Sequence, residues 1–261
     1  MSTSSINDKK AAPIALVTGA SRGLGKSMAL HLAERGVDVV LTYRSGEKEA
    51  RDVAAAIESK GRKAAALSLD VANSKTFGAF ADSLRGAIEK TWQRGKFDYL
   101  VNNAGIGVHA AFADTTEAQF DELVNVHLKG PFFLTQKLLP LIVDGGRILN
   151  VSTGLTRFTY PGYAAYASMK GAIEVLTRYQ AKELGDRRIS VNSIAPGAIE
   201  TDFGGGAVRD NADLNKAIAG MTALGRVGLP DDIGGAVNVL LSPEANWISG
   251  QRIEVSGGML L

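Results

Sequence analysis

The stretch Pro13-Ile14-Ala15-Leu16-Val17-Thr18-Gly19-Ala20-Ser21-Arg22-Gly23-Leu24-Gly25 decides the fold. It opens with a short apolar run, which is typical of a buried parallel strand. A glycine-rich turn follows, and a helical segment extends from about Lys26 to Arg35. Strand, turn and helix in this order gather backbone N–H groups at a helix N-terminus, an arrangement that binds a pyrophosphate. Arg22 and Lys26 lie where the helix dipole disfavours cations, so they also indicate an incoming anion.

Arg44 follows the second expected strand, Val37–Thr42. In dinucleotide-binding proteins an acidic residue at this point holds the ribose 2′-hydroxyl of NAD. The stretch Thr42-Tyr43-Arg44-Ser45 has no carboxylate, and an arginine beside a hydroxyl suits a 2′-phosphate. The sequence therefore favours NADP(H) over NAD(H). The alternative is that Arg44 pairs with a nearby glutamate, Glu47 or Glu49.

Tyr166-Ala167-Ser168-Met169-Lys170 places a phenol and an ammonium at positions i and i+4 of an expected helix. Such residues lie one above the other on one helix face. A neighbouring ammonium favours the phenolate, so we expect the pKa of Tyr166 to fall from about 10 toward neutrality. A phenol of this kind can donate or accept a proton near neutral pH. The alternative is an ordinary helix surface with one aromatic residue and one cation.

The chain has 261 residues, with no linker, repeat or low-complexity run that would divide it. Apolar runs alternate with helical segments throughout, which predicts an α/β fold with one doubly wound parallel sheet and helices on both faces. We expect a single Rossmann-like domain over residues 13–261, preceded by a flexible tail over residues 1–12. The further strands are expected at Lys63–Leu69, Phe97–Asn102, Arg147–Val151, Ile189–Ala195 and Arg252–Val255.

Composition argues against several function classes. A net charge of +2 gives no reason to expect nucleic acid as a partner. The chain has no cysteine, so disulfides and thiol catalysis are excluded, and the spacing of its histidines suits no metal site. Residues 1–10 lack the apolar core of a signal peptide, and no segment is apolar enough to span a bilayer. A cytoplasmic enzyme without membrane association is the expectation.

Five motifs in this order resemble the classical short-chain dehydrogenases/reductases, including their 3-oxoacyl-reductase-like members. They are the glycine-rich turn Thr18–Gly25, Asn102-Asn103-Ala104-Gly105, Asn125, the Tyr166/Lys170 pair and Pro196-Gly197. The resemblance extends from Pro13 to the C-terminus. It implies NAD(P)-dependent oxidoreduction between carbonyl and alcohol groups, with a small-molecule substrate, by a homotetramer or dimer.

The cofactor contacts implied by this resemblance follow the ends of the expected strands. Because the carboxyl ends of parallel strands meet at one edge of a sheet, these residues should converge there. Asp70 could instead cap the turn that begins at Val71. The full cofactor set is Gly19, Ser21, Arg22, Gly23, Leu24, Gly25, Arg44, Ser45, Asp70, Val71, Asn102, Ala104, Gly105, Tyr166, Lys170, Pro196, Gly197, Ile199 and Thr201.

The resemblance also implies a catalytic set. Tyr166 would donate a proton to the substrate oxygen, Lys170 would bind the cofactor ribose, and Asn125 would hold a water that relays protons. The family usually has a serine thirteen residues before the tyrosine, and here Thr153 occupies that position after Ser152. Either hydroxyl could steady the carbonyl oxygen. We favour Thr153, because successive strand residues face opposite sides.

The substrate is less well defined by the sequence. Tyr160, Tyr163 and Phe203 are expected at the substrate mouth, and residues 203–221, which contain a triple glycine, are expected to form a lid. Tyr163 lies seven residues before Lys170, a spacing used by enoyl reductases of the divergent short-chain branch, but these carry a different glycine motif, so this role for Tyr163 is disfavoured. The apolar and acidic stretch 141–146 does not suit an acidic carrier protein, so a free ketone or aldehyde is favoured. Alternatives are an alcohol or sugar dehydrogenase, a 3-oxoacyl-(acyl-carrier-protein) reductase and a non-catalytic NADP-binding regulator.

Overall fold

A computed structural model describes residues 11–261, so the predicted tail over residues 1–12 lies almost wholly outside the described part of the chain. Residues 11–261 form a seven-stranded sheet in the order β3-β2-β1-β4-β5-β6-β7, and each pair of neighbours is parallel. This confirms the predicted doubly wound α/β fold. The strands are β1 (Ile14–Val17), β2 (Asp38–Tyr43), β3 (Ala64–Ser68), β4 (Phe97–Asn102), β5 (Ile142–Val151), β6 (Ser190–Pro196) and β7 (Arg252–Val255).

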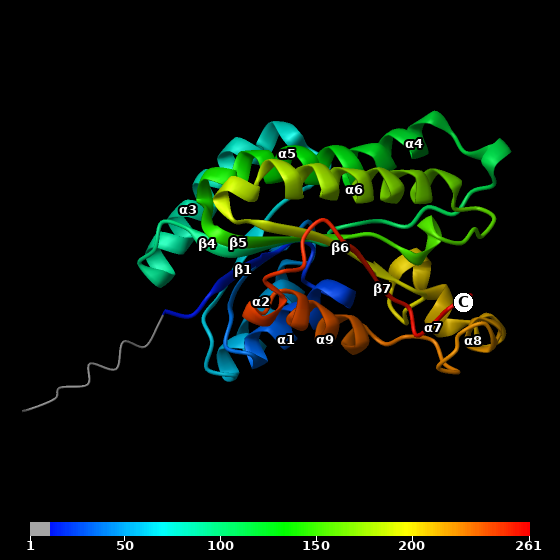
Figure 1. Ribbon diagram of the computed structural model, residues 1–261. Helices are drawn as coiled ribbons and strands as arrows, with labels where there is room; N and C mark the ends of the chain where they lie inside the picture. Colours follow the sequence, from blue (N-terminus) through cyan, green and yellow to red (C-terminus); the bar gives the residue numbers. More distant parts are fainter. Residues whose placement is uncertain (1–10) are drawn as a thin grey trace, which may run out of the picture.

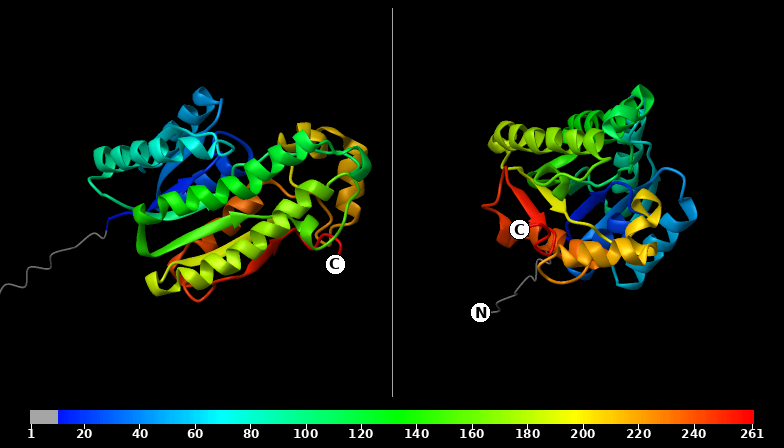
Figure 2. Two further views of the ribbon diagram at one scale, coloured as in Figure 1. Left: turned by 90° about the horizontal axis from the view of Figure 1, so that it is seen from above. Right: turned by 90° about the vertical axis from the view of Figure 1, so that its right-hand side faces the viewer.

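Helices cover both faces of this sheet. Figure 1 shows α1, α2 and α9 below the sheet and α3 to α6 above it, with α7 and α8 following β6 at one end. Figure 2 shows the same layers from above and from the side. The helices are α1 (Gly23–Glu34), α2 (Glu47–Ser59), α3 (Phe77–Trp92), α4 (Glu117–Val124), α5 (Gly130–Leu138), α6 (Ala164–Glu183), α7 (Ala207–Asp210), α8 (Ala212–Gly220) and α9 (Pro230–Leu240).

The inner strands of the sheet supply side chains to two separate cores. In β1, Ala15 and Val17 face a core shared with α1, α2 and α9, whereas Ile14 and Leu16 face a core shared with α3 and α5. All four side chains are fully buried. Successive strand residues point to opposite faces, so a strand covered on both sides must be apolar throughout. This explains why an inner strand such as β1 reads as a continuous apolar run rather than as an alternating pattern.

The observed strand ends lie within one or two residues of those predicted, except in β5. This strand begins at Ile142, five residues before the predicted start at Arg147. Ile142 pairs with Phe97, and the register with β4 then shifts before Tyr99. Gly145, in the shifted segment, has a φ of +78°, which favours glycine. The irregular register hides this part of the strand from a sequence pattern.

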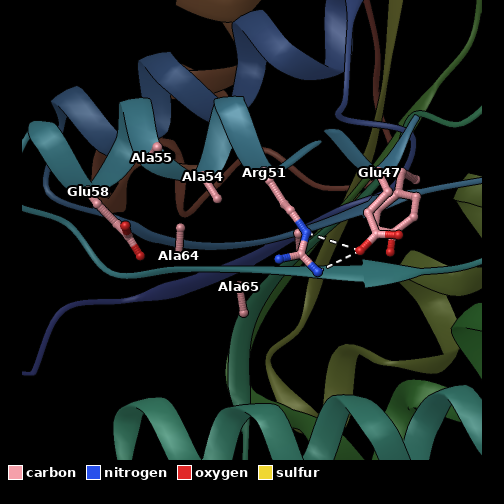
Figure 3. Close-up of a pocket in the computed structure, with 9 residues that line it drawn as sticks. Glu47, Arg51, Ala54, Ala55, Glu58, Ala64 and Ala65 are labelled. Carbon is pink, nitrogen blue, oxygen red and sulfur yellow. Dashed lines mark hydrogen bonds and ion pairs between the residues drawn. The ribbon is translucent and has the colours of Figure 1, made fainter. Parts of the chain in front are cut away.

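A groove of about 400 Å³ lies between α2 and the outer strand β3. Alanines from both elements form much of its wall, among them Ala54 and Ala65. Figure 3 shows Arg51 in the wall of this groove, between the alanines and Glu47, to which it is hydrogen-bonded. The groove runs along the edge of the sheet rather than at the strand ends where the predicted motifs lie. Across residues 11–261, no helix has the length and hydrophobicity that a bilayer crossing requires.

Candidate active site

The turn between β1 and α1 exposes bare backbone. Gly19 and Gly23 have φ values of +64° and +55°, a region that side chains other than glycine adopt only with strain. A Cβ atom at Gly25 would collide with the Gly19 carbonyl oxygen. The residue before the helix, Arg22, makes no side-chain capping hydrogen bond, so the first N–H groups of α1 stay open. Such a helix start binds phosphate groups.

The end of β4 is tied directly to this turn. Asn103 donates hydrogen bonds to the Thr18 and Gly19 carbonyl oxygens, at 2.8 and 3.1 Å. The Thr18 hydroxyl in turn accepts from the backbone N–H groups of Asn103 and Ala104, both at 3.0 Å. Two of the sequence motifs therefore meet at the carboxyl edge of the sheet, as predicted from the parallel order of their strands.

Three cations surround the same edge. Arg22, Lys26 and Arg44 are exposed, and within residues 11–261 none of them forms an ion pair. Glu47 pairs with Arg51 at 2.6 Å, so the alternative Arg44–Glu47 pair does not form. Bare glycine backbone, an open helix start and unpaired cations fit a ligand that carries several phosphates.

Tyr166 and Lys170 lie one turn apart on α6, with the lysine nitrogen 5.7 Å from the centre of the phenol ring. Both side chains are buried, at 8% and 5% exposure. Lys170 donates to the Val151 carbonyl oxygen at 2.7 Å, at the end of β5. Burial lowers the pKa of this ammonium to about 7.

The expected lowering of the Tyr166 pKa is wrong for the polypeptide itself. Burial raises the pKa of the phenol, and a hydrogen bond with Thr153 opposes this only in part. The desolvation of a group packed against Leu123 and Met169 outweighs the neighbouring ammonium, which faces the Val151 carbonyl oxygen instead. The phenol is therefore protonated at neutral pH.

The two neighbouring hydroxyls at the end of β5 point in different directions. The Thr153 hydroxyl accepts from the Leu155 N–H at 3.3 Å and lies close enough to the Tyr166 phenol to lower its pKa. The Ser152 hydroxyl donates to Glu174 at 2.6 Å, away from the tyrosine. Of the two candidate hydroxyls, only that of Thr153 is therefore a neighbour of the Tyr166 phenol.

Asn125 opens an irregular turn in a long helix that runs through α4 and α5. Residues Asn125–Lys129 form a π-helical turn, in which the Gly130 N–H bonds to the Asn125 carbonyl oxygen. Pro131 has no N–H to offer the carbonyl four residues earlier, so the wider turn accommodates the proline. The Asn125 side chain is half-buried.

His127, in the same turn, is a site residue that sequence reasoning missed. Its ring packs edge-on against Tyr166, with the centroids 5.1 Å apart, and Nε2 lies 2.8 Å from the Ile106 carbonyl oxygen. Its Nδ1 is buried and has no hydrogen-bond partner among residues 11–261. Burial and the charge of Lys170 hold the pKa of His127 well below its usual range, so the ring is neutral. Its place in an apolar helix pattern offered no signal of this contact.

Aromatic side chains surround Tyr166 on its outer side. Phe203 and Tyr163 have ring centroids 5.7 and 6.5 Å from that of Tyr166, and His109 packs edge-on against Tyr163 at 5.0 Å. Tyr160, the third residue expected here, is 40% exposed. Phe203 precedes three glycines with positive φ, which begin the segment predicted to form a lid. That segment contains α7 and α8.

The other predicted cofactor residues follow the ends of the strands. Asp70 caps its own turn by accepting from the Ala72 N–H at 3.0 Å, which was the alternative role for this residue. Asn102 is buried and donates to Asn150 and Thr135, at 2.8 and 3.0 Å, so its side chain ties β4 to β5 and α5. Thr201 lies against the glycine turn, since it is the neighbour that a Cβ atom at Gly23 would contact.

The remaining predicted residues are placed by backbone contacts. Ser21 lies beside Gly46, in the loop that follows β2 and carries Ser45. Pro196 ends β6, and the Gly197 N–H donates to the Val255 carbonyl oxygen at 3.1 Å. Ile199 bridges to Gly228. Leu24 packs against the core beneath α1, Gly105 against His127, and Val71 against the core that contains α3.

Comparisons with known proteins agree with this geometry. A family model described as "Enoyl-(Acyl carrier protein) reductase" matches residues 19–260. The hydroxynaphthalene reductase-like protein Arp2 of Metarhizium brunneum is 35% identical over 260 residues, which cover 95% of both chains. The chain is a classical short-chain dehydrogenase/reductase.

Solved structures of other short-chain dehydrogenases/reductases superimpose closely on this chain. The promiscuous reductase LugOII, which catalyses keto-reduction at C1 during lugdunomycin biosynthesis, has a TM-score of 0.91 and 36% identity, covering 96% of this chain and 99% of its own. The angucycline C-6 ketoreductase LanV with bound NADP has a TM-score of 0.90 and 36% identity, with 95% of each chain covered. These similarities extend over the whole described fold and confirm that the protein is an oxidoreductase of this family.

Proposed function

We propose that this short-chain dehydrogenase/reductase reduces a ketone or aldehyde to an alcohol with NADPH, and that Tyr166 is the proton donor. The observation that carries the proposal is that Thr153, Tyr166 and Lys170 are neighbours at the sheet edge that also holds the glycine turn: the Thr153 side chain acts on the Tyr166 phenol, and the Lys170 nitrogen lies 5.7 Å from the centre of the phenol ring. Two hydroxyls at one point can both hydrogen-bond to a single carbonyl oxygen. LanV, a ketoreductase with bound NADP, supports the same reaction class.

The chain's own residues would act as follows. Gly19, Arg22 and Arg44 would hold the phosphates of the dinucleotide, which supplies the hydride when bound. Thr153 would orient the carbonyl oxygen of the substrate and stabilise the negative charge that develops on it. Tyr166 would then give its proton to that oxygen, which completes the alcohol. The phenol is protonated before the transfer, and the alkoxide that develops on the substrate is a stronger base than a phenolate, so it can take this proton.

The aromatic mouth supports a flat, aromatic ketone as the substrate. Phe203, Tyr163 and His109 surround the outer side of Tyr166, and such rings bind planar aromatic molecules by stacking or edge contacts. LanV acts on an angucycline, and Arp2 is named for hydroxynaphthalene. The stretch 141–146 supports a free substrate over a carrier-bound one, because it contains no basic side chain that could bind an acidic carrier protein. The nearby Arg187 is paired with Asp144 of this stretch. Oxidation of an alcohol or a sugar is the second candidate.

The test follows NADPH absorbance with planar aromatic ketones and with a 3-oxoacyl thioester. Tyr166→Phe should lower kcat by about a thousandfold, while NADPH binding, measured by fluorescence, stays within a few-fold. Tyr163→Phe is the matched control and should retain most of the turnover. Undiminished turnover in Tyr166→Phe would exclude this residue as the donor.

The cofactor preference has its own test. Arg44→Glu should raise KM for NADPH by at least about tenfold and leave KM for NADH nearly unchanged, because only NADPH carries the 2′-phosphate. The matched control is Arg51→Glu, on the outer face of α2, whose partner is Glu47. If Arg44→Glu weakens both cofactors equally, the assignment of a 2′-phosphate contact to Arg44 is wrong.

We also propose that the protein is a homo-oligomer. Apolar side chains are exposed on two adjacent helices, with Phe132 and Phe133 on α5 both 42% exposed and Tyr179 on α6 64% exposed. A second copy of the chain would bury this surface. Gel filtration with light scattering distinguishes a dimer or tetramer from a monomer.

A further inference from the structure

A cluster of charged and hydroxyl side chains lies behind Thr153, on the side away from the substrate mouth. Its centre is Glu174 on α6, whose Oε1 accepts hydrogen bonds from Ser152 at 2.6 Å, Thr156 at 2.7 Å and Arg252 at 2.8 Å. The Glu174 side chain is only 14% exposed and that of Arg252 23%. A largely buried carboxylate with three donors on one oxygen is held in a fixed position. We call this cluster, with Glu254 and Arg157, the Glu174–Arg252 network.

Arg252, on β7, uses its whole guanidinium fork. Nε donates to Glu174, Nη1 donates to Glu254 at 3.0 Å, and Nη2 donates to the Thr153 carbonyl oxygen at 3.2 Å. An ammonium has no planar fork, so a lysine cannot make these three contacts together. The guanidinium therefore holds the backbone of Thr153 directly.

A second arginine anchors the far side of the same loop. Arg157 donates through Nε and Nη2 to the two oxygens of Glu254, both at 2.7 Å, and through Nη1 to the Leu260 carbonyl oxygen at 2.9 Å. Burial acts to raise the pKa of Glu254, but hydrogen bonds from Arg157, Ser256 and Arg252 lower it to about 2. The carboxylate thus stays ionised over the working pH range.

The network joins the two elements that carry the proposed reacting groups. Tyr166, Lys170 and Glu174 recur every four residues along one face of α6. Glu174 holds Ser152, directly before Thr153, and Thr156, three residues after it. The loop that presents Thr153 is therefore attached to the helix that presents Tyr166, although neither Glu174 nor Arg252 contacts either hydroxyl.

We propose that Glu174 and Arg252 are positioning residues that hold the Thr153 hydroxyl at Tyr166. The inference rests on the proposed function for the reaction that the two hydroxyls serve. It assigns to Ser152 the role of anchoring the loop to Glu174 rather than of contacting substrate. A displacement of Thr153 should lower kcat and leave cofactor binding intact, because the glycine turn and Arg44 lie on other elements.

The test is a double-mutant cycle between Arg252→Lys and Thr153→Ala. Arg252→Lys should lower kcat by about tenfold, with KM for NADPH within about twofold. In a Thr153→Ala background the same change should lower kcat by less than about twofold, because the hydroxyl that the network positions is gone. An equal tenfold loss in both backgrounds would show that Arg252 does not act through Thr153, and would overturn the proposal.

The matched control is Arg187→Lys. Arg187 also joins a carboxylate to a backbone carbonyl, bonding Asp144 at 2.8 Å and Leu139 at 2.9 Å, but near the beginning of β5. Arg187→Lys should therefore leave kcat within about twofold of the unchanged enzyme. A loss as large as that of Arg252→Lys would mean that the kinetic effect is a general loss of fold stability.

A second readout does not depend on turnover. Amide hydrogen exchange over residues 152–157 should become at least about fivefold faster in Arg252→Lys and stay unchanged in Arg187→Lys. If exchange in this loop does not change in Arg252→Lys, the positioning role is wrong. A failure to reduce any ketone would refute the proposed function alone, and the exchange measurement would still decide whether the network holds the loop.

Discussion

Replacing the buried Lys170 with methionine should change how the stability of the protein depends on pH. The side chain is 5% exposed, and its pKa falls from 10.5 to about 7 in the folded protein. Between these two values the unfolded chain binds more protons than the native protein, so the free energy of unfolding rises with pH. The slope approaches about 1.4 kcal/mol per pH unit for one group. Lys170 alone should therefore contribute about 2 kcal/mol of added stability between pH 7 and pH 9.

Urea unfolding, followed by tryptophan fluorescence at both pH values and fixed protein concentration, measures this contribution. Methionine cannot titrate, so the free energy of unfolding of the wild type should rise by about 2 kcal/mol relative to that of Lys170→Met between pH 7 and pH 9. Loss of the hydrogen bond to the Val151 carbonyl oxygen changes the free energy of unfolding of the variant equally at both pH values, so it cancels in this comparison. Lys137→Met, at an exposed position on α5, should show no such difference. Parallel stability curves for wild type and Lys170→Met would refute the buried, low-pKa lysine.

Three further predictions concern single contacts. In NADPH oxidation assays, Thr153→Ser should keep kcat within about threefold of the unchanged enzyme, and Thr153→Val should lower it about a hundredfold, because only serine retains the hydroxyl. Equal losses of kcat in the two variants would show that the hydroxyl has no part in the mechanism. Gly25→Ala should lower the melting temperature by several degrees and weaken NADPH binding. Gly171→Ala is the control and should do neither, because an added Cβ atom there meets no described atom within 4 Å. Scanning fluorimetry compares the two variants, and equal melting temperatures would contradict the close packing at Gly25. His127→Phe keeps an aromatic ring against Tyr166 but loses the hydrogen bond to the Ile106 carbonyl oxygen. It should therefore lower the free energy of unfolding by about 1–2 kcal/mol, measured by urea unfolding. An unchanged urea midpoint would show that this bond contributes little.

Local patterns were sufficient to predict most of the fold. The apolar runs and the Tyr166–Lys170 spacing depend on neighbours in the sequence, the strands other than β5 lie close to their expected bounds, and Tyr166 and Lys170 lie in a helix as expected. The convergence of Gly19, Asn103 and Thr153 followed from the parallel order of the strands. The early start of β5 was not predictable, since it depends on the pairing of Ile142 with Phe97, a residue far away in the chain.

The site was less predictable where tertiary burial decides the chemistry. The direction of the Tyr166 pKa shift depends on packing against residues from other elements, such as Leu123. The choice between Ser152 and Thr153 depends on Glu174, which lies 22 residues after Ser152, and on Arg252, 78 residues beyond Glu174. No spacing rule links residues so far apart, so these roles required the three-dimensional arrangement.

The groove between α2 and β3 has a consequence for the mechanical strength of the sheet. Alanines such as Ala54 and Ala65 cover little apolar area, so the edge strand β3 gains little from packing against α2 beyond its ladder of hydrogen bonds with β2. β3, one of the two edge strands, is therefore a place where the sheet can loosen at a distance from the reacting groups. Larger apolar side chains introduced there would strengthen the packing of β3 against α2, and they would leave the chemistry at the carboxyl edge unchanged.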